Sequence, residues 1–302
     1  MMELEKLATE KRNAETAEID SVSTLEMIRL IHTEDQKATA AITPLLPQIA
    51  AAVDVIAERL RRGGRLFYVG AGTSGRLGIL DAAECPPTYG TAPELVQGLI
   101  AGGRAAVFCA QEGAEDDSDG GRQDLAACTL TAADAVVGLS ASGRTPYVIG
   151  ALTYAKNCGA AVISVDCSSD APISRCSDID ICALVGAEVI TGSTRMKAGT
   201  AQKLILNMLS TGVMVRLGKV YGNLMVDVKT SNKKLEERAC RIVMEAASCS
   251  RAAATEALSA ANGHAKTAIV MILLGLSATA AAAALERHGG YIRNVLEAGC
   301  GT

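Results

Sequence analysis

The chain has 302 residues, a formal net charge of −4 and only 3% aromatic residues, with no Trp. A chain of this length can bury one medium-sized hydrophobic core and a smaller second one. Its acidic balance and its shortage of aromatic stacking platforms argue against nucleic acid as a partner. The composition, 49% hydrophobic and 21% charged, is ordinary for a soluble globular protein.

Cysteine and histidine usage bears on metals and on the redox compartment. Ten cysteines are scattered singly, without a C-x-x-C pair, and there are three histidines. We therefore expect free thiols in a reducing compartment and no metal site. The N-terminus, MMELEKLATEKRNAETAEID, lacks an apolar signal segment, and the most apolar run, TAIVMILLGL, is about half as long as a membrane helix. These features predict a cytoplasmic protein with no membrane partner.

The first 45 residues are predicted to form an N-terminal helical arm. Within it, Ser23 followed by Glu26 fits a capping box at the start of the helix STLEMIRLIHTED. Pro44 and Pro47 separate this helix from the next one, IAAAVDVIAERLRRGG, whose glycine pair predicts its end.

From residue 65 onward, short apolar runs alternate with helical stretches. Five runs are predicted as buried strands: RLFYVG, ELVQGLIAG, DAVVGLSAS, AAVISVDC and DICALVG. Helices are predicted in between, among them GRLGILDAAEC and PYVIGALTYAKNCG, and a long helix from about 198 to 217 follows. This alternation is typical of βαβ units. Residues 46–225 are therefore predicted to form an α/β domain with a doubly wound, five-stranded parallel sheet flanked by helices.

After about residue 225 the strand signals stop. Five short helical segments follow, from KKLEERACRIVMEAAS to YIRNVLEAG. They predict a small, all-helical C-terminal domain over residues 226–302, whose alanine-rich faces suit close helix packing.

Ligands of doubly wound sheets bind beyond the carboxyl ends of the strands. The turn after the first strand, residues 70–76, matches G-x-G-x-x-G, which alone could indicate NAD. The second strand, however, ends in Ala-Gly-Gly at residues 101–103, where a dinucleotide site usually has an acidic residue. Gly72, Thr73 and Ser74 instead offer hydroxyls and backbone N–H groups at a helix N-terminus, which suits a terminal phosphate.

The third strand ends in a similar turn. Ser140, Ser142, Gly143 and Thr145 precede Pro146, which is a favoured first residue of a helix. One such turn is most often a simple helix cap. Two hydroxyl-rich turns after two parallel strands favour a phosphate held from both sides.

A third polar segment, residues 191–200, precedes the long helix. Ser193 and Lys197 are candidate ligand-binding residues there, although Lys197 and Arg195 are equally compatible with solvated surface charges. Glu84 lies near the end of the first helix of the sheet region, and Glu115 lies in the acidic loop EGAEDD. Composition and spacing alone do not single out either glutamate, because an isolated Glu is most often a surface charge.

Several strings together resemble one family. They are VGAGTSGRLGILDAAECPPTYG, EGAEDD, SASGRTPYV, VGAEVITGSTRMKAGTAQKLILNMLSTG, YGNLMVDV and HGGYIRNVLE, in addition to the N-terminal STLEMIRLIHTED. The chain resembles the N-acetylmuramic acid 6-phosphate etherases of the sugar isomerase (SIS) superfamily over nearly its whole length. One departure is Ala14, where the family usually has Pro.

The resemblance implies a carbon–oxygen lyase that converts N-acetylmuramic acid 6-phosphate and water into N-acetylglucosamine 6-phosphate and D-lactate, in cell-wall sugar recycling. It implies that Glu84 and Glu115 are the catalytic carboxylates, with no metal or organic cofactor, in a homodimer. A glutamate has an ordinary pKa of about 4.3, so a general acid near neutral pH must be buried. The apolar sequence around Glu84 favours it as the acid and Glu115 as the base at C2. Glu188 or a partner's His288 could open the sugar ring.

Three alternatives remain. A sensor similar to glucokinase regulatory proteins would keep the phosphate loops without needing an acid–base pair. An aldose–ketose sugar-phosphate isomerase would move a proton between C1 and C2 and release no lactate. An NAD-dependent oxidoreductase is supported only by the first glycine-rich turn.

Overall fold

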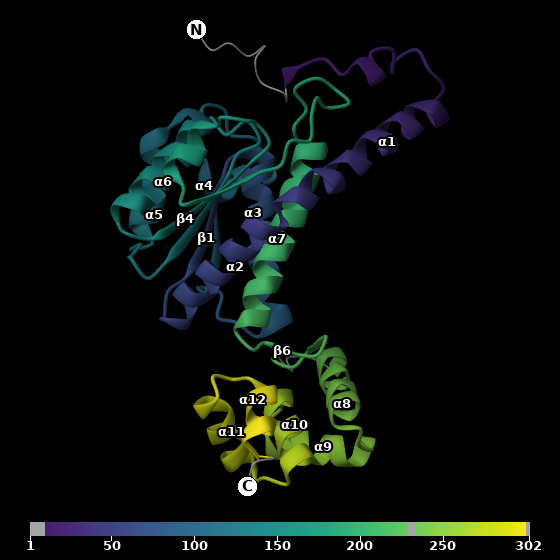
Figure 1. Cartoon of the computed structure of the whole chain (residues 1–302), viewed down its shortest axis with the longest axis vertical. Coiled ribbons are helices and arrows are strands. Elements are labelled where there is room, and N and C mark those ends of the chain that lie inside the picture. The colour runs from purple at the N-terminus through teal and green to yellow at the C-terminus, as the bar shows by residue number, and fades with distance from the viewer. Residues whose placement is uncertain (1–9, 229–232, 300–302) are drawn as a thin grey trace. The chain divides into compact units, whose positions relative to one another are not determined.

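The computed structural model describes residues 10–228 and 233–299. The chain divides into two compact units (Figure 1), Met1–Ala83 with Pro93–Ser210, and Glu84–Ala92 with Thr211–Thr302. The second unit thus includes a short segment from the middle of the chain and begins earlier than the expected boundary at residue 225. Cys300 and the first nine residues of the expected arm lie outside the described residues.

The N-terminal arm contains the helix α1 (Thr24–Ile42), and α2 (Leu46–Arg61) follows it at the start of the α/β domain. The expected cap is present, since the Ser23 hydroxyl accepts a hydrogen bond from the backbone N–H of Glu26 at 3.3 Å. A short 3₁₀ turn, Thr43–Leu45, joins the two helices. By length and composition, the helical stretch Thr24–Arg61 is long and apolar enough to cross a membrane, which the sequence analysis did not anticipate. Of its most apolar part, 28% is buried.

The sheet of the first unit has the five predicted parallel strands. They are β1 (Leu66–Gly70), β2 (Val96–Ile100), β3 (Ala135–Leu139), β4 (Ala161–Asp166) and β5 (Ile179–Cys182), in the spatial order β2-β1-β3-β4-β5. Gly70 pairs with Ile100 on one side and Leu139 on the other, so the carboxyl ends of β1, β2 and β3 lie at one edge. The predicted α/β fold is confirmed.

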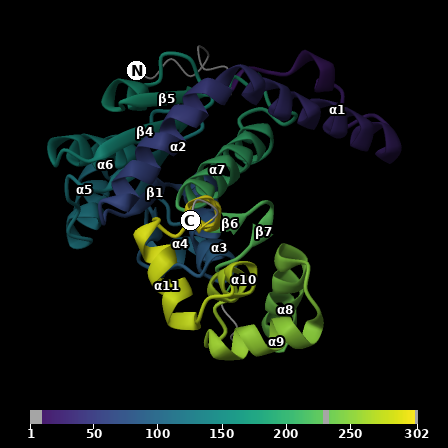
Figure 2. The same ribbon diagram turned by 60° about the horizontal axis from the view of Figure 1, so that its bottom comes forward.

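Helices cover both faces of this sheet. α5 (Ser118–Ala127) and α6 (Pro146–Asn157) lie side by side against one face, as Figures 1 and 2 show. Phe67 and Val136 belong to the buried core on that face. On the other face, Gly78 of α3 (Gly72–Tyr89) lies against Tyr68 and Leu139. Burial on both faces explains why the strands have continuous apolar sequences rather than alternating ones.

Helix α3 is longer than the sequence analysis expected. The predicted helix ended at Cys85, but the observed one continues through Pro86 and Pro87 to Tyr89. A proline has no backbone N–H to donate to the helix, but its φ lies in the helical range, so the helix can continue through it. The helix ends at Gly90, whose φ of +65° and N–H bond to the Pro86 carbonyl at 3.0 Å form the stop.

The strand order fixes where a ligand can bind. From β1 the chain crosses to β2 on one side, and β3 lies on the other side of β1. The loops that follow β1 and β3 therefore diverge, and they leave a crevice at the carboxyl ends of these two strands. The loops after β1 and β3 are the two hydroxyl-rich turns of the sequence.

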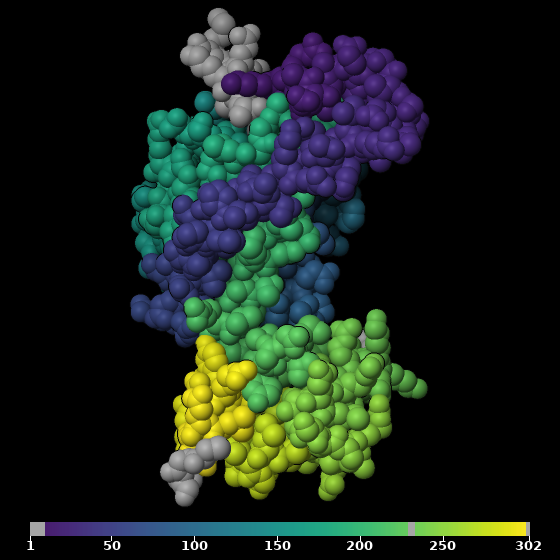
Figure 3. Space-filling model, turned by 45° about the vertical axis from the view of Figure 1, so that its right-hand side comes forward, coloured from purple at the N-terminus to yellow at the C-terminus, as the bar shows by residue number. Residues whose placement is uncertain are grey.

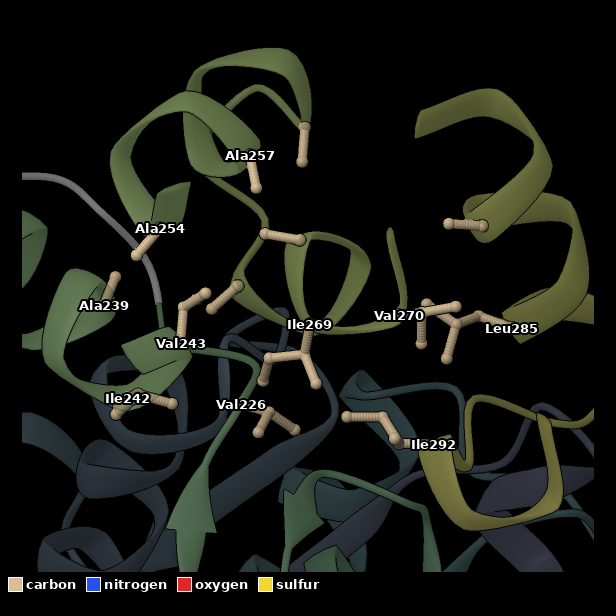
Figure 4. Close-up of a cluster of buried hydrophobic side chains, with 14 of the residues drawn as sticks. Val226, Ala239, Ile242, Val243, Ala254, Ala257, Ile269, Val270, Leu285 and Ile292 are labelled. Carbon is tan, nitrogen blue, oxygen red and sulfur yellow. The ribbon is translucent and has the colours of Figure 1, made fainter. Parts of the chain in front are cut away.

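The described part of the second unit contains α8 (Lys233–Ala247), α9 (Arg251–Ala260), α10 (Ala265–Leu274), α11 (Ala278–Arg287) and α12 (Ile292–Gly299). Val226, Val243 and Ile269 point toward one another in its core (Figure 4). A small antiparallel pair, β6 (Val220–Tyr221) and β7 (Leu224–Met225), was not predicted. Two-residue strands are too short to give a periodic signal.

Candidate active site

A cavity of about 250 Å³ lies in the first unit at the carboxyl ends of β1 and β3. The loop after β1 and the loop after β3 form most of its wall, and Glu10, Glu115 and Thr194 complete it. Six residues expected to bind the ligand line this cavity: Gly72, Thr73, Ser74, Ser140, Ser142 and Thr145. The structure therefore brings the two hydroxyl-rich turns together.

The first turn of α3 forms one wall of the cavity. Strand β1 passes directly into this helix because Gly70 has no side chain: a Cβ atom there would lie 2.7 Å from the backbone nitrogen of Gly75. Ser74 is buried, and its hydroxyl donates a hydrogen bond to Oε1 of Gln202 at 2.8 Å. That contact fixes the Ser74 oxygen, whose lone pairs can still accept a hydrogen bond.

The loop before α6 forms the opposite wall. The hydroxyls of Ser140 and Thr145 lie 2.8 Å apart, and Thr145 makes no side-chain cap to α6. The loop requires glycine at position 143, where φ is +66° and a Cβ atom would lie 2.2 Å from the Ala171 Cβ. Gly143 is buried and shapes the loop without lining the cavity.

The electrostatics of this cavity come from backbone and hydroxyl dipoles. The N-termini of α3 and α6 both border it, and its described lining contains no Lys or Arg. Helix N-termini carry a partial positive charge and free N–H groups, which bind phosphates well. The hydroxyls and helix N-termini are thus suited to one phosphate group, and the Glu10 and Glu115 side chains add two acidic groups to the wall.

The two expected catalytic glutamates differ in position. Glu115 lies in the 3₁₀ turn Ala114–Asp116 and lines the cavity. Glu84 lies near the C-terminal end of α3, in the part of that helix that belongs to the second unit. Both glutamate side chains are exposed in the single chain, so burial does not distinguish Glu84 as the acid. Within the first unit, Glu115 is present without Glu84.

Glu188 and Lys197 are buried and held by protein partners. The Glu188 carboxylate accepts the backbone N–H groups of Lys197 at 3.0 Å and Ala198 at 2.9 Å, where α7 (Lys197–Arg216) begins. Burial raises the pKa of Glu188, and these two hydrogen bonds oppose the rise. The Lys197 ammonium donates to the Glu34 carboxylate at 2.5 Å and to the Ala187 carbonyl at 2.6 Å.

Of the polar segment before α7, Thr194 lines the cavity. Glu188, Ser193 and Lys197 are not part of its described lining. A direct contact of these three residues with a ligand therefore stays a prediction from the sequence.

Glu10 is a site residue that the sequence analysis missed. The arm that carries it is fixed at two points, since Asn13 Nδ2 donates to the Ala187 carbonyl at 3.3 Å and the Thr16 hydroxyl donates to the Val189 carbonyl at 2.8 Å. A Cβ atom on Gly192 would lie 3.0 Å from Oε2 of Glu10. One Glu in a charged N-terminal segment carries no signal, because only tertiary contacts bring it to the cavity.

The nine described cysteines are free, and Cys85, Cys167 and Cys240 are buried. In the described part of the chain, no group of three or more His, Cys, Asp or Glu residues could hold a metal ion.

Some known protein families match individual domains of the chain, and other proteins match nearly its whole sequence. Residues 48–156 match the N-terminal SIS domain of glucokinase regulatory protein, residues 118–212 the SIS domain, and residues 222–266 the C-terminal lid domain of glucokinase regulatory protein. A Bacteroides fragilis structure described as a phosphosugar isomerase involved in capsule formation is 22% identical, with a TM-score of 0.50. That match covers 64% of this chain and 91% of the other, and it shows the shared fold.

Closer relatives match nearly the whole chain. The N-acetylmuramic acid 6-phosphate etherase of Photorhabdus laumondii subsp. laumondii is 56% identical over 295 residues, which cover 98% of each chain. The enzyme of the same name from Aeromonas hydrophila subsp. hydrophila is 57% identical over 291 residues, covering 96% of this chain and 98% of the relative. With this identity over its whole length, and with the SIS fold seen in the structure, the chain belongs to the N-acetylmuramic acid 6-phosphate etherase family.

Proposed function

We propose that this protein cleaves the D-lactyl ether of N-acetylmuramic acid 6-phosphate and releases N-acetylglucosamine 6-phosphate and D-lactate. The observation that carries the proposal is the identity of 56% and 57%, over nearly the whole chain, to etherases of that name. The cavity between the loops after β1 and β3 supports it, because its hydroxyls and helix N-termini suit the phosphate of such a substrate.

The phosphate is proposed to bind between the first turn of α3 and the loop before α6. Ser142 and Thr145 would donate hydrogen bonds to it together with the backbone N–H groups of both helix N-termini. Ser74 would donate as well once its hydroxyl turns from Gln202 to the phosphate. Binding energy from the phosphate would then orient the reacting carbons C2 and C3 of the sugar.

The chemistry is an elimination followed by an addition of water. In the open-chain sugar the C2 proton lies next to the aldehyde. A carboxylate removes this proton while the C3–O bond breaks, and the bond's electron pair leaves with the lactyl oxygen, which takes a proton from a general acid. Water then adds its oxygen to C3 and a proton returns to C2. Each proton taken from the sugar is balanced by one given back, so the net change is hydrolysis of the ether.

Glu115 is proposed as the base at C2, and its place in the cavity supports this role. Glu84 is proposed as the acid for the lactyl oxygen. Because Glu84 is not part of the described lining of the cavity, we propose that a homodimer supplies this carboxylate from a second copy of the chain. Such an enzyme is a carbon–oxygen lyase of the cytoplasm, acting in the recycling of cell-wall sugars.

The exposed apolar side chains of α1 support the homodimer. Leu25 is 61% exposed and Ile28 55% exposed, and of the 19 residues of α1 only Glu34, Ala38 and Ile42 are buried. In Figure 3 the atoms of this arm, in purple, form a projecting ridge on the first unit. A helix with so little of its own packing is typical of a subunit interface.

The test is release of D-lactate from N-acetylmuramic acid 6-phosphate in water enriched in oxygen-18. Lactate release with the label entering the sugar at C3 is expected, because the C3–O bond breaks and water supplies the new oxygen. Tight sugar-phosphate binding without any lactate would contradict the proposal. It would favour a sensor instead, which the matches to domains of glucokinase regulatory protein make the second candidate.

A further inference from the structure

A second cavity, of about 220 Å³, adjoins the phosphate-sized one in the first unit. Both cavities are lined by Ala71, Gly72 and Glu115, so these residues form their common wall. A ligand that occupied both cavities would pass the Glu115 carboxylate at their junction.

The two cavities differ in chemistry. The first is lined by hydroxyls. The second has small apolar walls, formed by Ala71, Ala101, Ala106 and Ala110. Its polar groups are Gln111, the carboxylates of Glu112 and Glu115, and the guanidinium of Arg76. Arg76 is therefore the cationic donor that distinguishes the second cavity from the first.

The Arg76 guanidinium is held in place by the end of a helix. Its Nε donates to the Val107 carbonyl at 2.9 Å and its Nη2 to the Ala106 carbonyl at 2.8 Å, near the end of α4 (Gly103–Phe108). The third nitrogen, Nη1, makes no hydrogen bond to any described residue. A guanidinium has five N–H donors in a rigid plane and binds carboxylates through a pair of them. Arg76 is thus fixed in orientation and has donors left for an anionic ligand.

We infer that the second cavity is the subsite for the lactyl group of the substrate, an inference that rests on the proposed etherase function. The lactyl group has one methyl and one carboxylate, which match the alanine wall and the Arg76 donors. The ether that joins it to the sugar would then lie at the common wall, beside Glu115. The nearby carboxylates of Glu112 and Glu115 disfavour an anion, so recognition of the lactyl carboxylate depends on Arg76.

The test compares two ligands that differ in the lactyl group. N-acetylmuramic acid 6-phosphate carries it, and N-acetylglucosamine 6-phosphate does not. Ala110→Leu fills the second cavity from an exposed position, so it leaves the first cavity open. Ala105→Leu is the matched control, because Ala105 is an exposed residue of α4 outside the described lining of both cavities.

We expect Ala110→Leu to raise KM for the lactyl-bearing substrate by about tenfold or more, since an obstructed methyl-sized pocket discriminates on that scale. Its Kd for N-acetylglucosamine 6-phosphate, measured by calorimetry, should stay within about twofold of the wild-type value. Arg76→Lys keeps a charge but loses the fork, so it should weaken inhibition by D-lactate while sparing the sugar product. Ala105→Leu should change neither ligand's binding.

Equal weakening of both ligands by Ala110→Leu, or no effect on either, would overturn the subsite. Failure of the etherase proposal looks different, because the wild-type protein would then release no lactate. In that case the affinities of wild type and Ala110→Leu for both sugar phosphates are compared directly by calorimetry, and a selective loss for the lactyl-bearing one is still required.

Discussion

Glu115 lies where the chemistry of an ether cleavage would need a carboxylate, at the wall shared by two cavities. The neighbouring carboxylate, Asp116, is exposed like Glu115 but is not part of the described lining of either cavity. Substituting each residue in turn therefore separates two effects. A change at Glu115 tests a role in the reaction, and a change at Asp116 tests the effect of the loop's negative charge.

We expect Glu115→Gln to lower kcat for lactate release by about 10²- to 10⁴-fold, because a neutral amide cannot take the C2 proton. KM should stay the same or fall, since the amide keeps the size of the side chain and removes a charge that disfavours the lactyl carboxylate. Asp116→Asn is the control and should retain near wild-type activity in the same lactate assay. Residual activity of Glu115→Gln close to that of Asp116→Asn would show that Glu115 is not the base.

Asp166 is a second residue whose surroundings lead to a measurable consequence. It is fully buried at the end of β4, and its Oδ1 accepts the backbone N–H of Ser168 at 3.1 Å. Burial raises the pKa of Asp166 to about 7, and the negative charge of Asp180 adds to the rise. The folded protein therefore favours the protonated form of this carboxyl.

Because the folded pKa is higher than the unfolded value of about 3.9, the folded state binds more protons between these two pH values. Stability from Asp166 is thus complete below about pH 4 and is lost as the pH rises toward 7. Asp166→Asn removes this loss, so its free energy of unfolding relative to wild type should increase from pH 5 to pH 8, by up to about 1.4 kcal/mol per unit of pKa difference. Urea unfolding of both proteins at pH 5 and at pH 8 measures this difference in the free energy of unfolding.

Asp170→Asn is the matched control, since Asp170 is exposed and its φ of +54° also suits Asn. It should leave the pH dependence of wild type unchanged. Identical pH dependence of Asp166→Asn and wild type would contradict the raised pKa.

At the scale of secondary-structure elements, α1 and the start of α7 are joined by a buried ion pair. The ion pair between Lys197 and Glu34 is almost fully buried, with side chains 1% and 3% exposed. Lys37 also donates to the Glu34 carboxylate at 2.5 Å. Although burial opposes it, hydrogen bonds from Lys197 and Lys37 hold the pKa of Glu34 below its usual value. The pair fixes the arm on the helix that follows residues 187–194.

Removing one member of this pair should destabilise the protein strongly. We expect Lys197→Met to lower the free energy of unfolding by about 3–5 kcal/mol, because it leaves the buried Glu34 carboxylate without its buried cation. Lys203→Met is the control, as an exposed lysine of the same helix, and should change stability by less than about 0.5 kcal/mol. Equal effects of the two substitutions in urea unfolding would refute the argument.

A double variant, Glu34→Leu with Lys197→Met, removes both charges at once. It should recover part of the lost stability, since replacing a whole buried pair by apolar side chains is often neutral. No recovery would indicate that packing around Lys197, rather than the unpaired charge, caused the loss.

At the scale of the whole molecule, α1 carries apolar residues that its own chain does not bury. If α1 forms the subunit interface, a charge on this helix should separate the copies. We expect Leu25→Asp with Ile28→Asp to shift the mass seen by light scattering from twice 31.1 kDa to 31.1 kDa. Circular dichroism checks that the helices are retained. A wild-type protein that is already monomeric would rule out the proposed homodimer.

A mixed dimer tests whether the two catalytic glutamates come from different copies. Glu84→Gln and Glu115→Gln chains are co-expressed with different affinity tags, and the heterodimer is purified through both tags. If each site takes one glutamate from each chain, one of its two sites is intact, and about half of the wild-type activity is expected. If both glutamates came from the same chain, the heterodimer would be as inactive as either single variant.

The sequence by itself determined the elements and the class of site. Apolar runs gave all five strands, because strands buried on both faces are apolar throughout. The hydroxyl-rich turns after β1 and β3 predicted a cavity between them, since parallel strands place their carboxyl ends at one edge. The family resemblance, confirmed by identity over nearly the whole chain, added the reaction.

Only the tertiary structure decided which polar residues face the cavity. Lys197, a candidate ligand-binding residue in the sequence, is buried against Glu34, which lies 163 residues earlier in the chain, and its contact with a ligand stays a prediction. Glu10 reaches the cavity because the arm is bonded to residues 187 and 189. The apolar sequence around Glu84 gave no warning that its side chain is exposed. These positions are set by contacts between residues far apart in sequence, and such contacts cannot be predicted from local composition.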